Sequence, residues 1–208
     1  NHGDLGVCWR LACELAARGH AVRLWVDEPA GLAWMAPAGY DGVQVLAWTA
    51  DSPAPEPGDV VIEAFGCELP QAFVQRMQHR AQMAAQGATK APAVWINLEY
   101  LSAEPYVERS HGLPSPVMSG PAQGLTKWFF YPGFTARTGG LIREPHLGLP
   151  RQGDGSLPRP GHESTSVANT PSPAQRPARA QGDRALRVSL FCYEPPGLGQ
   201  WLQGLRQS

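Results

Sequence analysis

The sequence predicts an α/β fold in which helices connect the strands of a parallel sheet. Two patterns in the 208 residues support this prediction. Segments with apolar residues at helical spacing alternate with short apolar segments of strand length. Several of these short segments, such as residues 59–65, are mainly apolar, which is typical of strands covered on both faces. Because helices placed between buried strands form βαβ units, we expect a parallel sheet.

Helices and strands follow one another through the first half of the chain. The first helix is predicted at residues 7–18 and ends at Gly19, because glycine is common just past the last helical turn. The next segments are predicted as strand, helix, strand, strand, helix and strand in turn: residues 21–27, 29–35, 43–48, 59–65, 70–85 and 93–98. The chain begins at Asn1, within the loop that leads into the first helix. Such a loop usually follows a strand, so we expect a fragment that lacks its first strand.

Three regions are predicted along the chain. Residues 1–149 form the first α/β domain, with a further strand predicted at residues 127–131. Residues 150–185 are rich in proline, glycine, serine, glutamine and arginine. They bury too little apolar surface to offset the entropy lost on ordering, so we expect a flexible linker. Residues 186–208 begin with a strand of buried type and continue into a helix predicted at residues 197–205, which we interpret as the start of a second α/β domain.

Composition and charge exclude several classes of function. A formal net charge of −1 leaves no basic excess for binding nucleic acid. No apolar stretch is long enough for a membrane-spanning helix, and no signal peptide is visible. The four cysteines form no CxxC pair, and no group of cysteines and histidines has the spacing of a zinc site. We therefore expect a cytoplasmic protein with reduced thiols and without a zinc site, a nucleic-acid partner or a membrane.

Carboxylates lie near the ends of several predicted strands. Asp27, Glu63 and Glu99 are at or close to the carboxyl ends of their strands, and Asp4 lies just before the first helix. In open parallel sheets, ligands bind outside these strand ends. A rim of carboxylates suits a cationic ligand and supplies candidates for general base catalysis. The simpler alternatives are that Asp4 caps the helix and that the other carboxylates solvate loops or cap helices.

The remaining candidates also have ordinary structural alternatives. The glycines of the loop at residues 1–6 lack the spacing of a dinucleotide-binding or phosphate-binding loop. His2 and His111 are single histidines, for which a structural role is the more common one. Phe191 and Tyr193 share one face of a strand, where aromatic rings either stack on a nucleobase or pack in the core. The residue pattern alone leaves these alternatives open.

Five segments carry a resemblance to one family. They are NHGDLGVCWRLACELAARGHAVRLWVD, DVVIEAFGCELP, WINLEYLSAEPYVERSHGLPSP, KWFFYPGFTARTGGLIRE and RVSLFCYE. Together they are similar to the bacterial protein-arginine rhamnosyltransferases that modify elongation factor P, over residues 1–144 and again over residues 186–194. The resemblance implies a GT-B-type glycosyltransferase. In that fold, a Rossmann-like N-terminal domain holds the protein acceptor and a second Rossmann-like domain binds dTDP-β-L-rhamnose.

The resemblance also implies a reaction and its residues. L-rhamnose is transferred to an arginine of elongation factor P, with inversion at the anomeric carbon and no metal or other cofactor, and Asp4 is the general base. The implied donor site combines residues from both ends of the chain: Asn1, His2, Gly3, Asp4, Phe191 and Tyr193. Because an arginine guanidinium stays protonated in water, carboxylates must orient it, and we expect Glu63 or Glu99 to hold the acceptor.

Two other functions fit the sequence. One is a docking module that binds elongation factor P without turnover. The other is a GT-B glycosyltransferase with a different sugar or acceptor. Because most of the donor site lies in the implied second domain, we expect the 208-residue chain by itself to be inactive.

Overall fold

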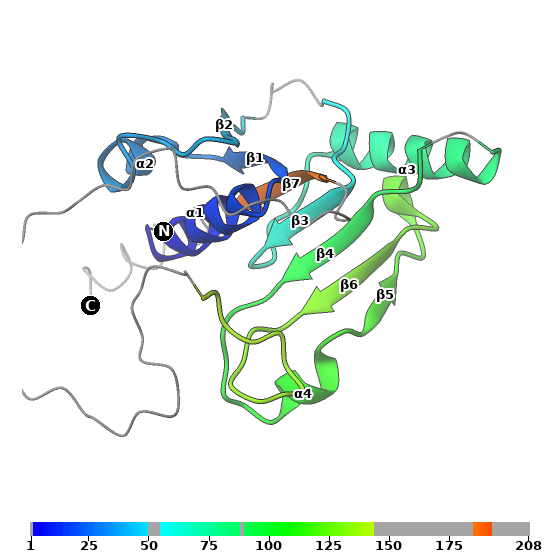
Figure 1. Ribbon diagram of the computed structural model, residues 1–208. Helices are drawn as coiled ribbons and strands as arrows, with labels where there is room; N and C mark the ends of the chain where they lie inside the picture. Colours follow the sequence, from blue (N-terminus) through cyan, green and yellow to red (C-terminus); the bar gives the residue numbers. More distant parts are fainter. Residues whose placement is uncertain (1, 50–54, 88–89, 144–184, 193–208) are drawn as a thin grey trace, which may run out of the picture.

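Figure 1 shows the computed structural model, an α/β fold built on a single sheet. The structure describes residues 2–49, 55–87, 90–143 and 185–192. Within these ranges the sheet has seven strands in the order β2-β1-β7-β3-β4-β6-β5. The strands are β1 Ala21–Val26, β2 Val43–Ala47, β3 Val60–Ala64, β4 Val94–Leu98, β5 Pro114–Pro116, β6 Thr126–Phe130 and β7 Arg187–Cys192. The helices are α1 His2–Ala17, α2 Ala30–Met35, α3 Gln71–Ala85, α4 Tyr106–Ser110 and the short 3-10 helix Gly120–Ala122.

The strand pairing confirms the parallel sheet that the sequence predicts. Neighbouring strands run parallel from β2 to β6, and β5 pairs with β6 in the antiparallel direction at one edge. The first helix differs from the prediction, because α1 begins at His2 and Asp4 lies in its first turn rather than in a preceding loop. A carboxylate near a helix N-terminus interacts favourably with the unpaired backbone N–H groups there. The apolar spacing used to predict the helix does not register this contribution.

β7 differs from the predicted division into domains. Residues 186–208 are predicted to begin a second domain, whereas the structure places β7 in the centre of the first sheet, hydrogen-bonded to β1 and β3. Every residue from Val188 to Cys192 is buried. A largely apolar strand is stabilised by a central position in any sheet, and its pattern does not specify which sheet it joins. The helix predicted at residues 197–205 and residues 150–184 of the predicted linker lie outside the described residues.

Helices cover both faces of the central strands, so the core has two layers. Figure 1 shows α1 and α2 on one side of the sheet and α3 on the other. Cys8, Leu24 and Leu190 are fully buried in the layer under α1. Phe73 and Phe191 are each 1% exposed in the layer under α3. Because successive side chains of a strand point to opposite faces, each strand contributes to both layers.

A buried arginine ties α3 to the amino-terminal ends of the strands. Arg80 is 9% exposed and donates hydrogen bonds to the carbonyl oxygens of Ala91 at 2.7 Å and Gly58 at 2.8 Å, and to Asp59 Oδ1 at 3.0 Å. Asp59 Oδ2 accepts a further hydrogen bond from the backbone N–H of Arg187, the first residue of β7. Burial raises the pKa of Asp59, but the hydrogen bonds from Arg187 and Arg80 outweigh it and hold this pKa below its ordinary value. The network therefore fixes the start of β7 against β3 and α3.

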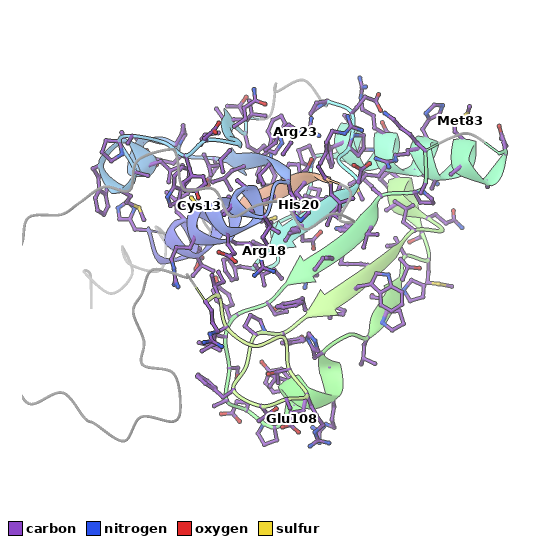
Figure 2. The ribbon with its side chains drawn as sticks, viewed as in Figure 1. Cys13, Arg18, His20, Arg23, Met83 and Glu108 are labelled. Atoms are coloured by element: carbon purple, nitrogen blue, oxygen red, sulfur yellow. The ribbon has the colours of Figure 1, made fainter. Side chains whose placement is uncertain are left out.

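Ser189 is a buried polar residue of β7, and its hydroxyl is hydrogen-bonded on two sides. Arg23, labelled in Figure 2, donates to Ser189 Oγ at 3.0 Å and to the carbonyl oxygen of Glu56 at 2.7 Å. The backbone N–H of Gly58 donates to the same Ser189 Oγ at 3.3 Å. These bonds satisfy a polar group that would otherwise destabilise the core.

Gly58 permits the chain to pass close to β7. A Cβ atom at Gly58 would lie 2.5 Å from the carbonyl oxygen of Arg187, so the backbone would have to move. We expect Gly58→Ala to lower the free energy of unfolding by about 1–3 kcal/mol, measured by urea denaturation. The matched control is Gly6→Ala in α1, where the added Cβ meets the flexible end of Met35 at 3.3 Å. Alanine favours a helix over glycine, so the control should match or exceed the wild type, and equal losses from both variants would contradict this prediction.

Candidate active site

Asp4 lies at the carboxyl-terminal edge of the sheet. α1 runs back along the sheet before β1, so its first turn lies at the edge where the parallel strands end. The Asp4 residue is only 6% exposed. The hydroxyl of Tyr100, which follows β4 closely, donates a hydrogen bond to Asp4 Oδ2 at 3.0 Å. The structure therefore places the predicted general base beside the strand ends, where ligands bind in parallel sheets.

An aromatic stack lies against this hydrogen bond. Phe65 directly follows β3, and its ring stacks on that of Tyr100 with the centroids 4.5 Å apart and the planes at 18°. Among the described residues, Phe65 is the one non-glycine residue with a positive φ, 59°. Gly66 follows with a φ of 73°. The two left-handed residues turn the chain sharply at the end of β3 and leave the Phe65 ring against Tyr100.

Glu63 lies on the opposite face of the sheet from Asp4, under α3, and is already paired. Its carboxylate accepts hydrogen bonds from Lys127 Nζ and, at 3.0 Å, from the indole N–H of Trp95. The ammonium group of Lys127 also lies 4.6 Å from the centroid of the Trp95 ring. The Glu63 side chain is 5% exposed, and this burial raises the pKa of Glu63 although Lys127 opposes the shift. Glu63 is therefore part of a buried ion pair with its own lysine.

Glu99 is the more accessible of the two predicted acceptor carboxylates. It follows β4 directly and is partly exposed. Its Oε1 accepts a hydrogen bond of 2.6 Å from the side-chain amide of Asn97, which is itself 3% exposed. Burial raises the pKa of Tyr131 and the nearby charge of Glu99 raises it further, so this carboxylate also acts on the loop after β6. Glu99 thus lies at the sheet edge next to Tyr100, the hydrogen-bond partner of Asp4.

A cleft of about 720 Å³ lies on the α3 face of the sheet. Its lining includes Glu63, Trp95, Asn97 and Lys127 from the strands and Glu68 from the loop before α3. Asp4 is not among the lining residues. The structure therefore separates two of the predicted carboxylates, with Asp4 on the α1 face and Glu63 in the cleft.

The other predicted site residues are placed as follows. His2 and Gly3 are exposed at the start of α1, and the His2 ring contacts Trp34 edge to face at 5.6 Å. Asp27 is exposed after β1 and accepts a hydrogen bond of 2.8 Å from the backbone N–H of Glu28, the ordinary role considered for it. His111 Nδ1 accepts a hydrogen bond of 3.1 Å from the backbone N–H of Tyr131, which is a structural role. Asn1 and Tyr193 lie outside the described residues.

Phe191 is placed differently from the donor-site role that the resemblance implies. Its ring is 1% exposed and lies between the rings of Trp25, Trp48 and Phe73, with centroids 4.9 to 5.6 Å away. A ring enclosed by three others has no face left for a nucleobase. In this structure Phe191 is a core residue, because β7 occupies the centre of the sheet and turns this side chain under α3.

Three further features of the described residues bear on the predictions. All four cysteines are free thiols. No group of three or more histidine, cysteine, aspartate or glutamate side chains lies where it could hold a metal ion, within the part of the chain that the structure describes. The same part contains no helix that is both long and apolar enough to cross a membrane.

The fold and the acidic site at the strand ends define a Rossmann-like α/β domain, a class that binds its ligands at this edge. Comparison with known proteins then shows the family. The family model described as "Elongation-Factor P (EF-P) rhamnosyltransferase EarP" matches residues 1–208, and the chain belongs to this family.

Curated relatives carry the name protein-arginine rhamnosyltransferase. The protein from Pseudomonas aeruginosa is 43% identical to this chain in a match that covers 100% of this chain and 52% of the relative. The protein from Pseudomonas putida is 44% identical over 99% of this chain and 51% of the relative. A Neisseria meningitidis relative is 37% identical over 69% of this chain and 36% of its own length. The chain therefore spans about half the length of the first two relatives.

Proposed function

We propose that this chain is the acceptor-binding part of a GT-B-type enzyme that transfers L-rhamnose from dTDP-β-L-rhamnose to an arginine of elongation factor P. The family and the names of the relatives support this proposal. The observation in the structure that supports it most is Asp4, a buried carboxylate at the carboxyl-terminal edge of a parallel sheet. The reaction needs no metal in this proposal, and it takes place in the cytoplasm, where a translation factor is the substrate.

The proposed chemistry requires one base. An arginine nitrogen attacks the anomeric carbon of the rhamnose from the face opposite the dTDP group, which inverts that centre. The new carbon–nitrogen bond forms as the bond from carbon to the diphosphate oxygen breaks, and the electron pair leaves with dTDP. Because a free guanidinium is cationic, the attacking nitrogen must also lose a proton, and Asp4 accepts it.

Glu99 fits the acceptor-holding role better than Glu63. Glu63 is 4% exposed and already bound to Lys127 and Trp95, so a substrate guanidinium would have to displace the lysine. Glu99 is partly exposed and lies at the strand end next to Tyr100. We therefore assign Glu99 to orient the acceptor arginine and Glu63 to the structure of the cleft.

A hybrid enzyme tests the proposed function. Residues 1–208 replace the matching segment of the Pseudomonas aeruginosa relative, and the hybrid is mixed with elongation factor P and dTDP-β-L-rhamnose. We expect the intact mass of elongation factor P to increase by one deoxyhexose with the hybrid and to stay unchanged with the 208-residue chain alone. dTDP-glucose is the matched donor control. Transfer only from another donor favours a different glycosyltransferase, and binding of elongation factor P without any transfer favours a docking module.

A further inference from the structure

We propose that Tyr100, supported by Phe65, is a positioning residue for the base Asp4. The inference rests on the proposed function and adds to it two residues, Tyr100 and Phe65, to which neither the sequence pattern nor the resemblance gives a role. It is carried by three segments that are far apart in the sequence and meet at one point: the first turn of α1, the turn after β3 and the segment after β4.

The hydrogen bond from Tyr100 determines how the Asp4 carboxylate is oriented. The phenol O–H donates to Oδ2 at 3.0 Å. A carboxylate side chain can rotate about its last bond, so a base that is not held presents its second oxygen in many directions. Fixing Oδ2 fixes the carboxylate plane and therefore the direction of Oδ1. The proposed reaction needs that direction to match a nitrogen of the acceptor arginine as the new bond forms.

The Phe65 stack limits the movement of the tyrosine ring. The two ring planes are nearly parallel, with an angle of 18° between them, and the ring centroids are 4.5 Å apart. Phe65 adopts a φ of 59°, a conformation that costs free energy for a residue with a large side chain. Glycine would adopt the same backbone without this cost, as the neighbouring Gly66 does at 73°. Such strain is concentrated at functional sites, and here it accompanies a ring that contacts the partner of the proposed base.

The exposure of Tyr100 separates this role from core packing. The residue is 49% exposed, so its ring contributes less burial than a core aromatic. Its hydroxyl nevertheless reaches a carboxylate on a residue that is 6% exposed. A half-exposed tyrosine at the carboxyl-terminal edge of the sheet, bound to a buried acid, is placed where it affects the reaction more than the fold.

The test is Tyr100→Phe, which keeps the aromatic ring and removes only the hydroxyl. In the hybrid enzyme we expect kcat to fall about tenfold, with the KM values for both substrates unchanged. The lost hydrogen bond to a buried carboxylate also lowers the melting temperature, but by only a few degrees. A double-mutant cycle sharpens the test. In the Asp4→Asn background, Tyr100→Phe should change kcat less than about twofold, because the group it positions is already lost. Equal losses in both backgrounds would overturn the inference.

The matched control is Tyr106→Phe. Tyr106 is 44% exposed and contacts the ring of Tyr131 at 5.8 Å, so it resembles Tyr100 in exposure and aromatic surroundings. We expect this variant to keep wild-type kcat. An active wild-type hybrid with unchanged kcat in Tyr100→Phe would overturn the positioning role and leave the proposed function intact.

A second measurement uses the 208-residue chain and does not depend on activity. The NMR resonance of the Asp4 carboxyl carbon should shift in Tyr100→Phe and stay in place in Tyr106→Phe, because only the first variant removes a hydrogen bond to that group. If the wild-type hybrid transfers no rhamnose, the proposed function fails, and this comparison still decides whether Tyr100 holds Asp4. An unchanged resonance in Tyr100→Phe overturns the inference.

Discussion

Asp4→Asn is expected to reduce rhamnosyl transfer by the hybrid enzyme about 10²–10⁴-fold, the usual contribution of a general base. Asparagine has nearly the shape of aspartate, so it fits a position that is 6% exposed. Its amide oxygen still accepts the hydrogen bond from Tyr100, but the group no longer accepts a proton from an arginine nitrogen. The measurement is kcat from initial rates of deoxyhexose gain on elongation factor P, under saturation with both substrates.

The alternative role for Asp4 is to stabilise the start of α1, and the two roles give opposite results. Loss of a carboxylate from the first turn of a helix costs about 0.3–1 kcal/mol of stability through the helix dipole, and it has no effect on chemistry. The matched control is Asp27→Asn, which changes an exposed carboxylate at the end of β1. We expect this control to retain full activity. A stable Asp4→Asn hybrid that transfers rhamnose at more than half the wild-type rate would show that Asp4 only stabilises the helix.

Much of the sheet could be predicted because its strands are covered on both faces. Burial on two faces favours apolar residues at most positions, so β3 and β4 appear as short, mainly apolar segments close to their predicted bounds. The site edge followed from the same argument, since parallel strands end at one edge and Glu99 comes directly after β4.

The order of the strands could not be predicted, and the site depends on it. The apolar pattern of β7 indicates burial but not a position between β1 and β3. The resemblance implies a donor-site role for Phe191, whereas the residue pattern left core packing open, and the structure places this ring in the core. Glu63 and Lys127 lie 64 positions apart in the sequence, and only the pairing of β3, β4 and β6 brings them together. The local signals for this pair were two charged residues in mainly apolar or aromatic segments, Glu63 within residues 59–65 and Lys127 within residues 127–131.

The contact between Tyr100 and Asp4 could not be predicted from the sequence for a different reason. Tyr100 comes immediately after Glu99, whose charge at a strand end marks it as a candidate, but a tyrosine in a loop carries no pattern of its own. Its role depends on the left-handed turn at Phe65, a conformation that the amino-acid type disfavours and the sequence therefore does not indicate. Residues that act through tertiary contacts of this kind are found only from the structure.

Lys127→Met is expected to lower the free energy of unfolding by about 3 kcal/mol at neutral pH, because it leaves the Glu63 carboxylate buried without its counter-ion. The side chain of Glu63 is 5% exposed, and that of Lys127 is 24% exposed. Methionine keeps most of the length and apolar volume of lysine, so the loss arises from the charge. The measurement is urea denaturation of the 208-residue chain. The matched variant Lys127→Met with Glu63→Gln removes both charges and should recover most of the lost stability.

The pH dependence identifies Glu63 as the cause of that loss. Burial raises the pKa of Glu63 above its ordinary value of 4.5, and Lys127 opposes this shift, so Lys127→Met raises the pKa further. A carboxyl group whose pKa is raised by folding binds its proton more tightly in the folded state. Protonation of Glu63 therefore stabilises the folded state fully below about pH 4.5, and this stabilisation is lost as the pH rises through the raised pKa of Glu63. The difference in the free energy of unfolding between wild type and Lys127→Met should be largest at neutral pH and shrink towards pH 4.5. A difference that does not depend on pH would mean that lost packing, rather than an unpaired carboxylate, destabilises the variant.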